Sequence, residues 1–189
     1  MQRVHQLVFC LSLVGLSWLA MMGVHELGHV VGALVTGGNV ERVVLHPLTV
    51  SRTDVAPNPH PAVVVWMGPL VGSLLPLLLF AAVPGRFTVT RKVAQFFAGF
   101  CLIANGAYIS VGGLVRIGDA GEMLRTGTPL AVMLTFGAVT ILPGLHLWHR
   151  LGSPRQFIAD PPIVTPRMAY VTLAALVVVI VVEVALSPR

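Results

Sequence analysis

Long stretches without charged residues constrain the fold of this chain more than any other feature of its sequence. Four of them lack Asp, Glu, Lys and Arg except for one glutamate, at residues 7–35, 61–85, 93–115 and 129–148. A fifth, residues 168–186, contains only Glu183. Each is long enough to cross a hydrocarbon core, which takes roughly 20 helical residues. We therefore predict an all-α polytopic membrane protein with about five transmembrane helices.

The charge content agrees with this prediction. Only 10% of the 189 residues are charged, whereas a soluble domain has about 25%. The twelve Lys and Arg are spread over the segments between the predicted helices, which is typical of anchoring to lipid headgroups. We therefore expect the lipid bilayer, and no nucleic acid, as a partner. We expect residues 1–189 to form a single integral membrane domain that keeps its first apolar stretch as a helix.

The segment that follows the first predicted helix has a different character. That helix should end at the turn-forming residues 36–39. Two β-branched segments of mixed polarity, residues 40–45 and 48–53, then flank His46-Pro47, a pattern that predicts a short β-hairpin. Pro57, Pro59 and Pro61 follow, and each disfavours helix in the residue before it. The second span should therefore begin at about residue 61.

A His-Glu-Leu-Gly-His motif occupies residues 25–29, late in the first predicted helix. Because a helix advances about 100° per residue, His25 and His29 lie on one face, where both imidazoles can reach one metal ion. Hydrolytic zinc sites use this spacing, with a glutamate such as Glu26 taking a proton from the attacking water. The motif holds the only Asp, Glu, Lys, Arg or His between positions 5 and 41. Ionisable groups inside a membrane cost roughly 2.5 kcal/mol or more unless paired or hydrated, which disfavours a mere packing role.

Gly28 and Gly32 form a small-xxx-small surface beside the two histidines. Such a surface lets the backbone of another helix approach closely. We therefore predict a close helix contact next to the motif.

A catalytic zinc usually takes three protein ligands, so one more is needed. Consecutive spans alternate in direction, which places the end of the third helix on the same side of the membrane as the motif. Asp119 and Glu122 follow that end, and spacing leaves both as candidates, since either can instead pair with a neighbouring arginine. If the third helix continues to residue 119, Asn105, Gly112 and Asp119 fall on one stripe. Asn105 is most simply interpreted as an interhelical hydrogen-bonding residue.

Together these residues resemble the site-2 protease family of intramembrane zinc metallopeptidases. The resemblance covers about residues 7–125 and includes the motif, the hairpin-like segment, Gly68-Pro69-Leu70 and Gly118-Asp119-Ala120. It implies a three-helix catalytic core over about residues 7–125, to which the helices predicted from composition at about 129–148 and 168–186 are additional. It also implies one zinc ion per chain bound by His25, His29 and Asp119, with Glu26 as general base, and so favours Asp119 over Glu122.

The resemblance further implies a function. A minimal member of this family, without PDZ or CBS domains, would hydrolyse peptide bonds of membrane-embedded protein substrates in a bacterial-type cytoplasmic membrane. The family commonly has Gly-Pro-x-x-Asn in the second core helix, but Gly72 occupies the last position here. We therefore hypothesise that Asn105 supplies the missing amide.

A second hypothesis comes from a different functional class. The chain would then be a non-proteolytic metal-binding membrane protein, such as a carrier or a pseudoenzyme adaptor. The presence of Glu26 favours hydrolysis, because a site that only binds metal has no need of a general base.

Overall fold

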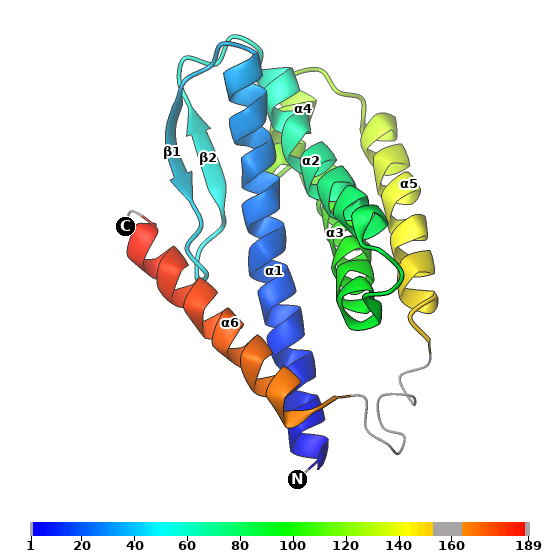
Figure 1. Ribbon diagram of the computed structural model, residues 1–189. Helices are drawn as coiled ribbons and strands as arrows, with labels where there is room; N and C mark the ends of the chain where they lie inside the picture. Colours follow the sequence, from blue (N-terminus) through cyan, green and yellow to red (C-terminus); the bar gives the residue numbers. More distant parts are fainter. Residues whose placement is uncertain (1, 153–163, 188–189) are drawn as a thin grey trace.

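The structure, a computed structural model, describes residues 2–152 and 164–187 (Figure 1). Within these residues the elements are α1 (Gln2–Val35), β1 (Val40–Val44), β2 (Arg52–Val55), α2 (Pro61–Ala82), α3 (Thr88–Val115), α4 (Gly118–Arg125), α5 (Leu130–His149) and α6 (Pro166–Leu186). All of these helices except α4 are long and apolar enough to cross a membrane. The chain is therefore a multi-pass membrane protein, and the predicted helical fold with five spans is confirmed.

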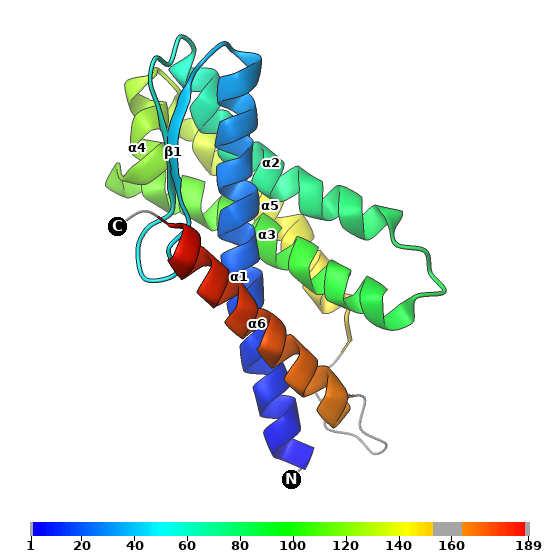
Figure 2. The same ribbon diagram turned by 60° about the vertical axis from the view of Figure 1, so that its left-hand side comes forward.

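Helix α1 lies at the centre of the arrangement (Figure 1). It packs against α2 on one side and against α6 on another, while α3 packs against both α2 and α5. The hairpin lies along the C-terminal half of α1, and Figure 2 shows it on the same side of α1 as the end of α6. The Leu45 amide there donates to the Ser187 hydroxyl, at 3.0 Å. The end of α6 is thus bonded to the end of the hairpin that follows α1.

Helices α1 and α2 are in contact where glycines replace side chains. A Cβ added at Gly28 would lie 2.2 Å from the Met67 carbonyl oxygen and 2.8 Å from the Gly68 Cα. At Gly32, an added Cβ would lie 2.9 Å from the Met67 Cβ. The predicted small-residue surface is therefore confirmed, and it brings the α2 backbone directly against the motif.

The end of α1 and the start of α2 agree with the sequence prediction. Gly37 has a φ of 76°, a left-handed conformation suited to glycine. The Gly38 amide donates to the Ala33 carbonyl at 2.8 Å, which completes a Schellman-type cap. Helix α2 begins at Pro61, where the absence of a proline N–H leaves no helical hydrogen bond unmade.

The hairpin forms, but its second strand begins later than the sequence predicts. Strands β1 and β2 pair antiparallel, with Val44 opposite Arg52, so the strand predicted over residues 48–53 instead covers Arg52–Val55. The preceding residues form a turn, in which the Thr49 amide donates to the His46 carbonyl at 3.1 Å. Leu48 in this turn is 87% exposed. Its side chain therefore gains no packing contacts that would stabilise a strand at this position.

The third span, α3, ends at Val115, where its charge-free stretch ends, and does not continue to residue 119. Arg116 adopts a left-handed conformation with φ of 59°. A new helix, α4, begins at Gly118. The continuous stripe through Asn105, Gly112 and Asp119 is therefore wrong. Asp119 is instead brought back by α4, whose Ala120 packs so closely on Gly112 that an added Cβ would lie 2.9 Å away.

Candidate metal centre

Three metal-ligating side chains from two helices converge on one point. His25 and His29 extend from α1, each 6% exposed, and Asp119 extends from α4. The Asp119 Oδ2 lies 2.7 Å from the His25 Nε2 and 3.2 Å from the His29 Nε2, and the two nitrogens are 3.1 Å apart. Among the residues that the structure describes, no other group of three or more His, Cys, Asp or Glu side chains is arranged to hold a metal ion. These three residues can hold one.

The donor set fits a zinc-type site. Zinc binds imidazole nitrogen and carboxylate oxygen with bonds of about 2.0–2.2 Å, so tetrahedral ligand atoms lie about 3.3 Å apart. Two of the three observed separations, 3.1 and 3.2 Å, are close to that value. Only the 2.7 Å pair of His25 and Asp119 would have to move apart, by about half an ångström.

The other ring nitrogen of each histidine is held by a hydrogen-bond acceptor. The His29 Nδ1 lies 2.8 Å from the Val64 carbonyl oxygen of α2. The His25 Nδ1 lies 2.6 Å from the Asn105 Oδ1 of α3. Because a carbonyl oxygen only accepts, both Nδ1 atoms must carry a proton, so that in the neutral form of each ring the Nε2 atom presents a lone pair.

The third ligating group is ionised. Burial on its own raises the pKa of the Asp119 carboxyl, but hydrogen bonding and charge interactions with His25 and His29 outweigh it and hold that pKa well below its ordinary value. An ionised carboxylate accepts hydrogen bonds and donates none. Those hydrogen bonds to Asp119 need a proton on an imidazole Nε2; when both rings are neutral and protonated on Nδ1, the three converging atoms are all acceptors, and a cation among them takes the place of that proton. This arrangement favours a metal ion.

The structure distinguishes the two carboxylates that spacing left open. Asp119 meets both histidines, and its backbone amide donates to the Tyr108 hydroxyl of α3 at 3.1 Å. Glu122 instead forms an ion pair with Arg125, one turn further along α4. Asp119, and not Glu122, thus joins the histidines.

Helix α2 leaves the space that the imidazoles fill. A Cβ added at Gly68 would lie 2.4 Å from the His29 Nε2 and 2.9 Å from the His25 Nε2. Any side chain at this position would therefore occupy the place of the ligands. The glycine of the Gly68-Pro69 pair has a direct steric role at the site.

Glu26 lies beside the triad in a polar cavity of about 380 Å³. It is 3% exposed, and its Oε2 accepts a hydrogen bond of 2.7 Å from the Thr53 hydroxyl of β2. His29 and Asp119 line the same cavity, as does every residue of β2. The cavity thus brings together two candidate metal ligands, a candidate base and one strand of the hairpin.

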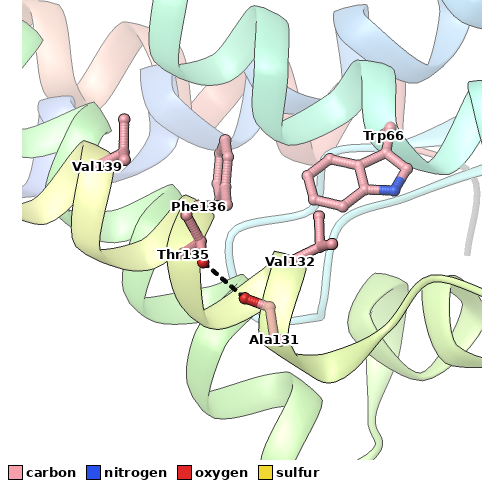
Figure 3. A pocket seen from close by; sticks show the side chains of 6 residues that line it. All are labelled: Trp66, Ala131, Val132, Thr135, Phe136 and Val139. Atoms are coloured by element: carbon pink, nitrogen blue, oxygen red, sulfur yellow. Dashed lines mark hydrogen bonds between the residues drawn. The ribbon is translucent and has the colours of Figure 1, made fainter.

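A second hollow, of about 400 Å³, lies between α2 and α5 and has a different lining (Figure 3). Trp66 and Phe136 are its aromatic lining residues, and their rings pack edge to face with centroids 5.5 Å apart. Its one hydroxyl, from Thr135, donates to the Ala131 carbonyl of its own helix. This hollow contains no titratable side chain and offers no chemistry comparable with the polar cavity.

Three partners of the site could not be identified from the sequence pattern. Val64 acts through its backbone carbonyl, for which no side-chain signal exists. Thr53 belongs to a strand whose register depends on the turn before it. Tyr108 follows Asn105 by one turn of α3. This spacing is the only sequence feature that places Tyr108 on the same side of the helix as Asn105.

No protein-family model, curated protein or solved structure matches this chain. Its function therefore has to be inferred from the geometry of the site.

Proposed function

We propose that this chain is an intramembrane zinc metallopeptidase of the site-2 protease type, which hydrolyses peptide bonds of membrane-embedded protein substrates. One observation carries the proposal. The ligating atoms of His25, His29 and Asp119 converge beside Glu26 in a polar cavity, and three of these four side chains lie within a membrane-spanning helix. A metal-binding site that did not hydrolyse a substrate would have no use for this glutamate.

The residues have separate roles in this reaction. Zinc held by the triad would activate water and polarise the scissile carbonyl. Glu26 accepts the proton of the attacking water and transfers it to the leaving amine. Its bond from Thr53 keeps the carboxylate in a fixed position at the edge of the cavity.

The substrate has to be extended before it can react. In a transmembrane helix the peptide bonds are hydrogen-bonded within the helix, so local unwinding must precede attack. Strand β2 supports this step, because all four of its residues line the cavity and an extended peptide can add to a strand edge. We propose that the hairpin receives the unwound segment next to Glu26, in a membrane of the bacterial cytoplasmic type.

Replacement of Glu26 by Gln tests the reaction. The purified chain would be reconstituted in liposomes with a panel of single-span test proteins that carry a different fluorescent domain at each end. We expect the parent to hold one zinc per chain and to release both domains separately. Glu26→Gln should hold the same zinc but cleave at least about 100-fold more slowly, the contribution of a general base. Glu183→Gln, on α6 and outside the lining of the cavity, serves as the control and should cleave like the parent.

Two results would overturn the peptidase proposal. One is equal cleavage by the parent and Glu26→Gln. The other is a parent that binds zinc but cleaves no member of the panel, which would favour a non-proteolytic metal-binding protein.

A further inference from the structure

Asn105 is the most deeply buried polar residue near the metal centre. It is 1% exposed, and both ends of its amide have partners. Its Nδ2 donates to the Cys101 carbonyl, one turn earlier in α3, at 2.9 Å. This bond fixes the orientation of the amide, so that Oδ1 is the atom that faces the His25 Nδ1 at 2.6 Å.

The orientation of this amide determines which nitrogen of His25 carries the proton. Since Oδ1 can only accept, the His25 Nδ1 must donate, and the lone pair of the neutral ring is left on Nε2. Nε2 is the atom that points to His29 and Asp119. If the ring flipped or changed tautomer, it would turn an N–H group or a carbon atom towards the ligand position.

The Asn105 side chain reaches His25 past a glycine of α2, the helix that packs against both α1 and α3. Helices α1 and α3 themselves barely touch each other. The amide reaches α1 where α2 has Gly72, since a Cβ added there would lie 2.8 Å from the Asn105 Oδ1 and 2.9 Å from its Nδ2. An amide that served only to pack α3 against its neighbouring helices would have no reason to extend past Gly72 to His25.

We propose that Asn105 is a positioning residue of the metal centre, which holds His25 in the tautomer and ring orientation that direct Nε2 at the ion. The proposal rests on metal binding by the triad, and it does not depend on peptide hydrolysis. Partners of this kind, bound to the non-ligating nitrogen of a histidine, typically contribute about 10–100-fold to metal affinity. Gly72 has a matching role, because it leaves room for the amide to reach His25.

Zinc affinity and the visible absorption spectrum of the cobalt-substituted protein test this role. Asn105→Leu keeps the branched shape of the side chain but removes the acceptor, so zinc affinity, measured by competition with a chelator, should fall about 10–100-fold. The cobalt bands should shift, because the ring is no longer fixed. Asn105→Asp restores an acceptor of the same reach, and its affinity should return to within about threefold of the parent, as in other carboxylate-histidine-metal arrangements.

Two further variants separate positioning from packing. Ser110→Ala, on the same helix, removes a hydroxyl that bonds only to carbonyls of α3, and it should leave zinc affinity and the cobalt spectrum unchanged. Asn105→Ser can keep a bond to the Cys101 carbonyl, but its oxygen is about 1 Å too short to reach His25. It should therefore behave like the leucine variant. If Asn105→Leu does not fold, Asn105→Ser replaces it, since it adds no bulk.

The outcomes distinguish failure of this proposal from failure of the proposed function. A parent that binds neither zinc nor cobalt more tightly than a His25→Ala His29→Ala double variant would show that the triad is no metal site. A parent that binds both ions, together with an Asn105→Leu variant of equal affinity and an identical cobalt spectrum, would overturn the role of Asn105 alone. An aspartate variant as weak as the leucine variant would overturn it as well.

Discussion

The two sides of α1 at the motif are built in different ways. On one side, His25 and His29 face α2 and α3, where their outer nitrogens are bonded to a backbone carbonyl and to a buried amide. Gly28 and Gly68 on this side allow no added Cβ without a clash. On the other side, Glu26 is bonded to a single hydroxyl, that of Thr53, on a two-stranded hairpin.

In the proposed function, this difference separates the residues that bind the metal from the residue that acts as the base. The histidines are fixed by close contact between membrane-spanning helices, which is dense and has little freedom to adjust. The proposed base, Glu26, is bonded to a small sheet, and two-stranded hairpins are only marginally stable by themselves. Mutations on the helix side should therefore change metal binding, whereas mutations on the hairpin side should change only the reaction.

The largest effect is expected for Gly28→Ala, which attacks the helix side directly. The new Cβ would meet the backbone of α2, so the two helices must separate, at a cost of about 3 kcal/mol. Thermal unfolding should begin at a lower temperature, and zinc content per chain should fall. Gly23→Ala on the same helix is the control, since an added Cβ there has nothing within 4 Å. Equal behaviour of the two variants would show that the close approach is not needed.

Asp119→Asn should have the next largest effect, through metal binding. It neutralises the proposed third ligand, so zinc affinity should fall by more than the factor of about 10–100 that is typical of outer partners, and cleavage should fall with it. The matched variant Glu122→Gln, at a residue that lines the same cavity without meeting the histidines, breaks the ion pair with Arg125 and should bind zinc like the parent. Competition with a chelator measures both. Loss of zinc from the glutamine variant with retention in the asparagine variant would contradict the assignment of the third ligand.

Thr53→Val tests the hairpin side. Zinc affinity should stay unchanged, whereas the cleavage rate should fall about tenfold, because a hydrogen bond to a charged group contributes about 1.5–3 kcal/mol. Thr49→Val, in the turn of the same hairpin, loses only a weak bond of 3.4 Å to the His46 carbonyl and serves as the control. A drop in zinc affinity in the Thr53 variant would show that the two sides of α1 are not separable.

The smallest effect is expected at the apolar hollow, which belongs to neither side. Trp66→Phe removes the bond from the indole Nε1 to the Thr128 hydroxyl and should destabilise the protein by about 1 kcal/mol. Trp148→Phe removes a comparable bond to the Phe96 carbonyl and should cost a similar amount. Zinc affinity and cleavage should be unchanged in both, as measured in the same liposomes. A change confined to the Trp66 variant would link the hollow to the site.

The spans could be predicted from the sequence because their signal is local and strong. Charge-free stretches of sufficient length have few alternatives to a membrane helix, and all five of those predicted are present in the structure. The β-hairpin was also predictable, but the start of β2 at Arg52 was not. It depends on a turn in which the His46 ring itself accepts the Leu48 amide.

The residues of the candidate metal site could be predicted from the sequence, but the helix that carries Asp119 could not. Asp119 was expected just past the end of the third helix or, if that helix continued, on it; it reaches the histidines from a separate helix, α4, after the left-handed Arg116. Glycine is the usual residue in that conformation, so an arginine at this position did not indicate that the helix ends there. Asn105 could be recognised from the sequence only as a polar residue in an apolar span. Its contact with His25 could not be predicted, because it depends on the opening that Gly72 leaves in a different helix.

The length of α1 determines how deep the site lies in the membrane. Residues 7–26 are twenty residues, which at a rise of about 1.5 Å each cover about 30 Å, the thickness of a hydrocarbon core. If the apolar part of α1 enters the bilayer at Leu7, Glu26 and its neighbours therefore lie at the far boundary and not at the midplane. Water needs to travel only a short way to reach them. A substrate would be cut near one end of its span, where unwinding breaks the fewest hydrogen bonds.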